Sequence, residues 1–380
     1  MSAYIINSEE PEMAEEKKKA KSSKENQDKY VAYISTYTRG DNHGIKIYDV
    51  DMETGRFKEK DEVDISNSSY VTVSHNGKYL YSITDLGVES YKIAPDGTLD
   101  LINFAPINGM RGCYLATDYT DRYLMVAGYH DGKLTVLHIK DNGGVGKITD
   151  EVFHKGLGSM ADRNFRPHIA SARMTHDNRY ILVADQGMDH VNVYELNQET
   201  GKIKLVDIIR CELESSPRQI KLSKDGRFIY ICLEATCKID VYEYTFDGKA
   251  PSFEKIQTVD VIKFESGAPS ALSALSFSSD YKYILTTVAG DNSVAIFAAD
   301  EKTGLLTKKL ILPVSGDYPK DAEILPGNKF LVSLNHESNE MSFFKLDIEN
   351  GTMIMNGDFV KVNTPNCILI HKLNPETSEK

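Results

Sequence analysis

A repeated pattern of short strands constrains the fold of this chain more than any other feature. An aromatic residue follows a turn at nearly regular intervals and begins a run rich in β-branched and aromatic residues, which favour strands. These anchor residues are Tyr30, Tyr79, Tyr123, Tyr180, Phe228, Tyr283 and Phe330. The intervals between them are 49, 44, 57, 48, 55 and 47 residues. Because self-similarity at about fifty residues is typical of propeller blades, the seven anchors predict seven blades.

The segment 216–244 shows the repeating unit most clearly. It opens with an extended Ser-Pro-Arg sequence and turns at Asp225 and Gly226, a pair that signals a hairpin between apolar runs. Residues 228–233 form the next predicted strand, and residues 239–244 alternate apolar and polar side chains as a half-buried strand does. Three antiparallel strands therefore follow one another without room for a helix.

A strand with the same alternation follows every anchor. These strands are predicted at residues 45–50, 88–93, 133–139, 190–196, 239–244, 293–297 and 341–346. A propeller blade contains four short strands. We therefore expect an all-β fold, a seven-bladed β-propeller with four-stranded antiparallel blades.

The two ends of the chain are predicted to close the ring together. Tyr30 lies on what is elsewhere the second strand of the unit, so the first blade lacks its innermost strand at the N-terminus. Near the other end, Thr364-Pro365-Asn366 resembles the Ser-Pro-Arg opening and precedes an apolar run at residues 367–372. Pairing the N- and C-terminal strands would remove the two exposed edges of an open array.

The predicted propeller spans residues 29–373 and is flanked by two tails. Residues 1–28 are charged and nearly free of apolar side chains, which predicts a disordered or loosely helical segment. They lack the apolar core and small-residue cleavage site of a secretory signal. Residues 374–380 are expected to form a short flexible tail.

Composition and charge exclude several classes of protein. The chain is 41% hydrophobic without a run long enough to cross a bilayer, and its formal charge of −12 disfavours unspecific binding to nucleic acid or an anionic membrane. Its five cysteines show no CxxC spacing, so we expect reduced thiols in a cytoplasmic protein. We expect no metal and no cofactor, because no His/Asp/Glu cluster has a metal-binding spacing. The sequence does not indicate the oligomeric state.

Charged residues beside the inner strands are the candidates for function, because propellers use loops that a rigid scaffold holds around the central channel. The candidates are Arg163, Arg166, His168, Asp185, Arg218 and Glu234. Glu234 ends a strand in apolar surroundings, and Asp185 is interpreted as the matching position one blade earlier. Equivalent positions on successive repeats face the same channel mouth. A carboxylate with arginines nearby therefore predicts a pocket for an anionic substrate.

Each of these residues also has a purely structural interpretation. A carboxylate at the end of a strand, such as Asp185 or Glu234, is often only solvated. Arg218 follows a proline and can bond to loop carbonyls, and His168 can be a hydrogen-bonded structural histidine. The sequence alone leaves these alternatives open.

Signatures of other propeller classes and of a nucleophilic enzyme are missing. The chain has no Trp, which the Trp-Asp type of blade requires. Gly143-Gly144 is its only Gly-Gly pair, whereas kelch-type blades carry one in each repeat. No Ser lies in a G-x-S-x-G elbow, so a serine nucleophile is not indicated.

Several phrases in the right order resemble the seven-bladed lactonase family, which includes the propeller type of 6-phosphogluconolactonase and the fungal carboxymuconate cyclase. The likeness runs from about Tyr30 to the C-terminal region. It is carried by AGYHDGKLTV at 127–136, RPHIAS at 166–171, VADQGMDHVNVYEL at 183–196, SPRQ at 216–219, LEATCKIDVYEY at 233–244 and SGDYPKD at 315–321. The resemblance implies the propeller fold and hydrolysis of a lactone.

The resemblance also implies roles for particular residues. Active members carry a His in the RPH loop, the Arg of a GPRH phrase, the Glu of an NEL phrase and an Arg of an NR or DR phrase. His168, Arg218 and Glu234 match the first three, whereas Ala170 and Ala289 stand where a second His and the second Arg would be. Substrate binding is assigned to Arg163, Arg166, Asp185 and Lys320.

These residues suit the opening of a sugar lactone. Glu234 is assigned as the base that activates water, Arg218 as the clamp for the oxyanion, and His168 as the acid for the leaving alkoxide. The leading hypothesis is a lactone hydrolase of the 6-phosphogluconolactonase type that acts on a small anionic sugar lactone in the pentose phosphate route. The alternative is a non-catalytic propeller that binds a small anion or a protein partner, which Ala170 and Ala289 favour.

Overall fold

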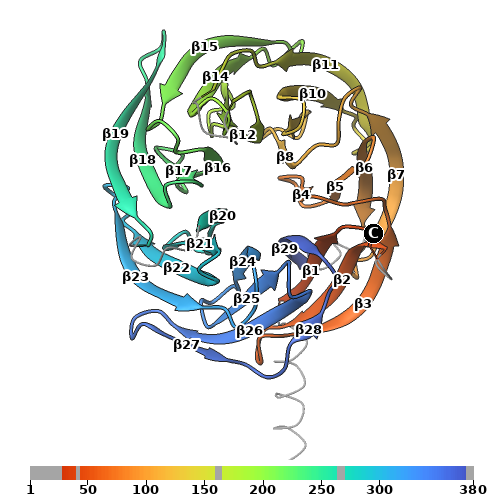
Figure 1. Cartoon of the computed structure of the whole chain (residues 1–380). Helices are drawn as coiled ribbons and strands as arrows, with labels where there is room; N and C mark the ends of the chain where they lie inside the picture. Colours follow the sequence, from red (N-terminus) through yellow and green to blue (C-terminus); the bar gives the residue numbers. More distant parts are fainter. Residues whose placement is uncertain (1–27, 40–42, 159–164, 263–269, 374–380) are drawn as a thin grey trace, which may run out of the picture.

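The computed structural model describes residues 28–39, 43–158, 165–262 and 270–373. The described residues form antiparallel sheets around a central channel, and no helix occurs among them (Figure 1). The predicted tails at 1–28 and 374–380 fall outside this range except for Asp28. The described chain contains no helix with the length and apolarity needed to cross a membrane.

Seven sheets make up the ring, and the strands of each follow one another from the channel outward. Blade 1 consists of β29 (Pro365–Leu373), β1 (Lys29–Thr36), β2 (Gly44–Asp51) and β3 (Arg56–Asp64). Blade 2 consists of β4 (Val71–Val73), β5 (Tyr79–Thr84), β6 (Gly87–Ile93) and β7 (Leu99–Pro106). Blade 3 consists of β8 (Tyr114–Thr117), β9 (Tyr123–Gly128), β10 (Lys133–Ile139) and β11 (Val145–Phe153). Blade 4 consists of β12 (Ile169–Met174), β13 (Tyr180–Asp185), β14 (His190–Leu196) and β15 (Ile203–Arg210).

The remaining blades repeat the same order. Blade 5 consists of β16 (Pro217–Leu222), β17 (Phe228–Leu233), β18 (Lys238–Phe246) and β19 (Pro251–Asp260). Blade 6 consists of β20 (Ala271–Phe277), β21 (Tyr283–Ala289), β22 (Ser293–Ala299) and β23 (Leu306–Pro313). Blade 7 consists of β24 (Pro319–Ile324), β25 (Phe330–Asn335), β26 (Glu340–Asp347) and β27 (Thr352–Met355), and β28 (Val360–Lys361) also pairs with β26. The predicted fold class is confirmed.

The second strand of each blade carries the repeat that the sequence shows. Six of the seven anchor residues begin a second strand, and Tyr30 is the second residue of β1. All six residues of β17 are buried, whereas no residue of β19 at the outer edge is buried. A strand that is covered on both faces needs apolar side chains at every position, which explains the continuous apolar runs after the anchors.

Apolar clusters between neighbouring blades form the core. Leu182 and Val193 of blade 4, for example, share one cluster of buried side chains with Ile229 and Tyr242 of blade 5. Because each sheet buries both faces against its neighbours, the blades have fixed positions around the channel. This rigidity is what places the loops at the channel mouth.

The two ends of the described chain close the ring, as the sequence predicts. β29 pairs antiparallel with β1 from Lys29 opposite Leu373 to Thr36 opposite Pro365. The innermost strand of blade 1 therefore comes from the C-terminal end (Figure 1). Without β29, the backbone donors and acceptors of β1 would face the channel without partners.

Removal of β29 should destabilise the whole ring. Deleting residues 365–380 exposes the edge of β1 and removes buried side chains such as Ile368. Since one buried Ile contributes about 2–5 kcal/mol, we expect the melting temperature to fall by about 10 °C or more. The matched control deletes residues 374–380 only and should melt like the full chain. Equal melting temperatures for all three proteins would refute the closing role of β29.

Candidate active site

Three innermost strands begin with the same strained backbone conformation. In each, a residue with a left-handed φ angle precedes a proline. The φ angles before the prolines are 55° at Ser216, 57° at Tyr318 and 43° at Thr364. Residues other than glycine adopt such angles only where the surroundings enforce them. The residues that follow the prolines all line one cavity at the channel mouth, and they are Arg218, Lys320 and Asn366.

A side chain from the preceding blade holds each of these openings. The backbone N–H groups of Ser216, Tyr318 and Thr364 donate to Asp189 Oδ1, Asn292 Oδ1 and Asn339 Oδ1 at 2.9, 2.9 and 2.8 Å. All three acceptors lie in the turn between the second and third strands and have positive φ angles, which Asp and Asn tolerate better than most residues. We call these contacts the inter-blade latches. They fix where each inner strand enters the channel.

A bulge then turns consecutive side chains of β16 into the cavity. Pro217 pairs with Leu233, but the next pair in the register joins Ile220 to Ile231, so β16 has one residue more than β17 over this stretch. The alternation of a regular strand is broken there. As a result, Arg218 and the following Gln219 both line the cavity.

The cavity has a volume of about 300 Å³ and is lined mainly by polar side chains. Its charged side chains include Arg218, Glu234 and Lys320, which come from blades 5 and 7. Gln186 of blade 4 and Tyr129 of blade 3 also line it. The size is at the lower end of the range for small-molecule sites.

A partly buried ion pair is the centre of this cavity. Glu234 Oε2 accepts hydrogen bonds from Arg218 Nη1 and from Gln186 Nε2. Burial raises the pKa of Glu234, but the charge of Arg218 and these hydrogen bonds outweigh burial and hold the pKa below its usual value. Burial likewise lowers the pKa of Arg218, and the charge of Glu234 more than reverses this effect. Both groups are therefore ionised at neutral pH.

Lys320 is a group in the cavity that changes charge at slightly alkaline pH. Burial, and next the positive charge of Arg218, lower the pKa of the Lys320 ammonium to about 8. The charge of Glu234 opposes this change only in part. Lys320 can thus attract an anion as an ammonium and can give up a proton at little cost.

Asp185 does not occupy the position of Glu234, which corrects the alignment made from the sequence. Asp185 pairs with His190 in the same way as Leu233 pairs with Lys238, so Gln186 is the residue that corresponds to Glu234. A shift of one residue turns a side chain to the other face of a strand.

The carboxylate of Asp185 is fully buried away from the cavity lining. It accepts hydrogen bonds from the N–H groups of His168 and Gly187 at 2.8 and 3.1 Å, and its other oxygen lies 2.6 Å from His154 Nδ1. Asp185 therefore holds the loop that precedes β12 against the end of β13.

His168 lies behind the cavity wall rather than in its lining. Its Nδ1–H donates to the carbonyl of Tyr129 at 2.8 Å, and its ring stacks on the Tyr129 ring with centroids 4.4 Å apart. This contact positions Tyr129, which does line the cavity. The structure thus brings Arg218, Glu234 and Lys320 together and places His168 one layer behind them.

The predicted arginines differ in where they lie. Arg166 is exposed with its guanidinium carbon 5.7 Å from the centroid of the Phe165 ring. Its charge contributes to lowering the pKa of His130, which lines the cavity, so Arg166 lies near the rim. Arg163 lies outside the described residues.

His130 is a cavity residue that the sequence does not single out, although it lies in the AGYHDGKLTV phrase. Burial, and next the charge of Arg111, lower the pKa of His130, so its imidazole is neutral at neutral pH. The signal that could have identified it is its place after the second strand of blade 3, in the same loop that carries Glu234 in blade 5. Of the two alanines, Ala170 lines the cavity, whereas Ala289 is buried within β21 and does not.

The donor set does not suggest a metal centre. Over residues 28–39, 43–158, 165–262 and 270–373, no group of three or more His, Cys, Asp or Glu side chains could hold a metal ion. The cavity instead contains the cations Arg218 and Lys320 together with the carboxyl groups of Glu234 and Asp321, and an anionic ligand would be bound by the two cations.

Comparison with known proteins agrees with this architecture. The family profile described as "Lactonase, 7-bladed beta-propeller" matches residues 31–370. The chain is 27% identical over 350 residues to a 6-phosphogluconolactonase of Bacillus subtilis (strain 168), which covers 90% of this chain and 98% of the relative.

Two solved structures have the same fold. The periplasmic gluconolactonase PpgL of Pseudomonas aeruginosa is 25% identical with a TM-score of 0.85, over 91% of this chain and all of that one. A putative 6-phosphogluconolactonase of Bacteroides fragilis is 26% identical with a TM-score of 0.81, over 90% of this chain and 98% of that one. The chain therefore belongs to the lactonase family of seven-bladed β-propellers.

Proposed function

We propose that the protein hydrolyses a sugar δ-lactone that carries an anionic group, with 6-phosphogluconolactone of the pentose phosphate route as the substrate. The observation that carries this proposal is the Arg218–Glu234 ion pair in a cavity that also contains Lys320. The name of the Bacillus subtilis relative supports the phosphorylated substrate.

Glu234 is the group suited to activate water. Its carboxylate is ionised at neutral pH because Arg218 holds its pKa low, and Gln186 fixes its orientation. A carboxylate that is held by two donors on one oxygen keeps lone pairs for a water proton on the other. In the proposed first step, Glu234 takes a proton as the water oxygen attacks the lactone carbonyl.

Arg218 and Lys320 are suited to the charge that develops in the next step. Attack on the carbonyl makes a tetrahedral oxyanion, which gains most from cations in a site that excludes water. The ring then opens as the C–O bond to the leaving alkoxide breaks, and that oxygen needs a proton. Lys320 can supply it, because its pKa of about 8 lies close to the working pH.

The anionic group of the substrate fits the rim of the cavity. Arg166 and Arg111 both act on His130 by their charges, so positive charge gathers beside the cavity mouth. Arg111 is partly engaged, since its Nη1 lies 3.1 Å from Asp85 Oδ1. Arginine binds phosphate with paired N–H groups, so Arg166 and Arg111 are our candidates for the phosphate contacts.

We further propose that the reaction takes place in the cytoplasm. All five cysteines of the chain are free thiols, which suits a reducing compartment. Cell fractionation tests this, and recovery of the protein in the periplasmic fraction would contradict it.

Enzymatic hydrolysis can be measured directly and compared with the spontaneous hydrolysis of the lactone in buffer. Fresh 6-phosphogluconolactone and unphosphorylated gluconolactone should each be mixed with the protein, and acid release followed by pH-stat. We expect a rate above buffer for both lactones and a higher kcat/KM for the phosphorylated one. A rate equal to buffer for both would instead favour the alternative, a propeller that binds an anion without hydrolysing a lactone.

Replacing the proposed base should remove the chemical step. Glu234→Gln keeps the shape of the side chain but removes the proton acceptor, so we expect kcat to fall by about 100-fold or more with little change in KM. Glu195→Gln is the matched control, because Glu195 is exposed on β14 away from the cavity. Far-ultraviolet circular dichroism should confirm that both variants are folded. Full activity of Glu234→Gln would show that another group is the base.

The protonation of Lys320 should give lactone hydrolysis a pH dependence. Lys320 is protonated below a pKa of about 8 and loses its charge above it, so kcat/KM for 6-phosphogluconolactone should fall as the pH rises through about 8. Lys320→Arg keeps the positive charge and should abolish this fall. Profiles of the same shape for both proteins, after correction for spontaneous hydrolysis, would exclude Lys320 from the reaction.

A further inference from the structure

A second cavity, of about 400 Å³, lies further along the channel on the same innermost strands. Several of these strands contribute to both cavities with residues three positions apart. Examples are Ala170 and Arg173 on β12, Arg218 and Lys221 on β16, and Lys320 and Glu323 on β24. We call the new space the Lys221 cavity and the site described above the Arg218 cavity.

Two tyrosines separate the two cavities. Tyr70 and Tyr114 line both of them, and their ring centroids are 4.4 Å apart. A pair of large side chains in contact at the boundary narrows the passage between the two spaces. The Lys221 cavity is therefore a site with its own lining.

The Lys221 cavity holds two cations that no carboxylate neutralises by contact. Within the described residues, neither Lys221 nor Arg173 forms an ion pair with Asp or Glu, although Arg173 interacts with the Tyr119 hydroxyl. The nearby carboxyl group is Glu323. Burial, and next the charge of Asp321, raise the pKa of Glu323 to about 8, so Glu323 is mostly uncharged at neutral pH.

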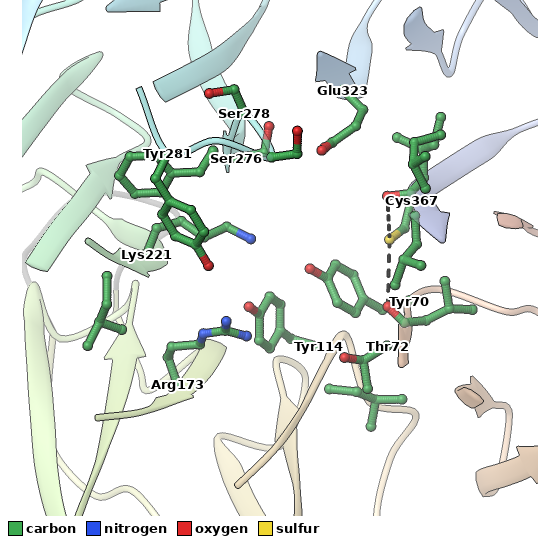
Figure 2. Close-up of a pocket in the computed structure, with 18 of the residues that line it drawn as sticks. Tyr70, Thr72, Tyr114, Arg173, Lys221, Ser276, Ser278, Tyr281, Glu323 and Cys367 are labelled. Carbon is green, nitrogen blue, oxygen red and sulfur yellow. Dashed lines mark hydrogen bonds between the residues drawn. The ribbon is translucent and has the colours of Figure 1, made fainter. Parts of the chain in front are cut away.

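The polar groups of this cavity converge on one space and are mainly hydrogen-bond donors. Figure 2 shows the Lys221 amine, the Arg173 guanidinium and the hydroxyls of Tyr70, Tyr114 and Tyr281 directed into the same opening. Ammonium and guanidinium groups can only donate, and phenols readily do so. Such a set leaves positive charge unmatched in partly buried surroundings, which is unfavourable unless an anion enters.

We propose that the Lys221 cavity is a second binding site, specific for a small oxyanion with two negative charges, of the phosphate or sulfate class. A guanidinium binds such an anion through two N–H groups, and an ammonium adds a point charge. The tyrosine hydroxyls supply further donors to its oxygens. This site does not depend on lactone hydrolysis, because neither of its two cations lines the Arg218 cavity.

Calorimetric titration with sodium sulfate at low ionic strength tests the proposal. Sulfate keeps the same charge throughout the pH range of the test. Any change of its affinity with pH therefore comes from groups of the protein. Lys221→Met removes one cation of the Lys221 cavity while keeping an unbranched side chain. Lys320→Met is the matched control, because it makes the same change on an innermost strand that faces the Arg218 cavity.

We expect Lys320→Met to retain a sulfate site that Lys221→Met weakens by about tenfold or more, the usual effect of losing a charge-assisted hydrogen bond. Thermal melting of both variants checks that they are folded. If Lys221→Met binds sulfate as the wild type does, or if Lys320→Met binds none, the anion does not occupy the Lys221 cavity and the proposal is overturned.

A second variant, Glu323→Gln, tests the site without removing either cation of the Lys221 cavity. Glu323 should ionise as the pH rises through about 8 and repel the anion, so sulfate affinity in the Lys320→Met background should fall between about pH 7 and about pH 9. Glu323→Gln should remove this fall. The charged and titratable groups near Glu323 or in the same cavity are Asp321, Lys221, Arg173, His176, Cys367, Tyr70, Tyr114 and Tyr281.

The titration of Asp321 or His176 could also make sulfate affinity depend on pH, but both groups titrate at lower pH than Glu323. Burial raises the pKa of Asp321 only to about 6, and burial lowers the pKa of His176, so neither changes charge over most of the range. The decisive comparison is between Lys320→Met alone and Lys320→Met combined with Glu323→Gln. Sulfate affinity that is equally independent of pH in both proteins would overturn the site as described.

Discussion

The inter-blade latches are the contacts on which the geometry of the channel mouth depends. In each latch, an Asp or Asn side chain of one blade accepts a hydrogen bond from a backbone N–H of the next blade. The donor is the residue that precedes the proline at the start of the inner strand. That residue has a positive φ angle, which costs energy for Ser, Tyr or Thr. The hydrogen bond and the fixed ring of the proline hold the backbone in this state. Arg218, Lys320 and Asn366 enter the channel from these openings.

The electrostatics of the channel follow from placing charged groups on buried inner strands. Arg218 and Glu234 offset the cost of burial by pairing with each other, so both stay ionised. Lys320 has no such exclusive partner, and its pKa falls toward neutrality. The same burial raises the pKa of Glu323 on the same strand. Burial thus lowers the pKa of a lysine and raises the pKa of a glutamate, so that both groups titrate near pH 8.

The fold can be predicted from the sequence because the repeat is carried by local patterns. The anchors mark second strands that are covered on both faces, and burial on both faces leaves a continuous apolar run. The closing strand is visible for a similar reason, since Thr364-Pro365-Asn366 repeats the opening found at Ser216. In the site, Arg218 and Glu234 stand out as a pair because both lie at strand ends of one blade.

The rest of the site cannot be predicted because it depends on register and on contacts between blades. The sequence aligns Asp185 with Glu234, whereas strand pairing makes Gln186 the equivalent residue. The bulges in the inner strands shift the alternation by one residue, so the sequence alone does not show that Lys221 faces the channel as Arg218 does. The pKa of His130 is lowered by burial and next by the charge of Arg111, which lies in another loop.

Closure of blade 1 by β29 also has a consequence for how the chain folds during synthesis. β1, β2 and β3 leave the ribosome early, but the innermost strand of their sheet is the last strand of the described chain. Until β29 arrives, the edge of β1 presents unpaired N–H and C=O groups that any other nascent strand can match. The first blade therefore stays incomplete while the other six blades are synthesised. Covering this edge until β29 arrives is therefore the point at which a chaperone would prevent incorrect pairing.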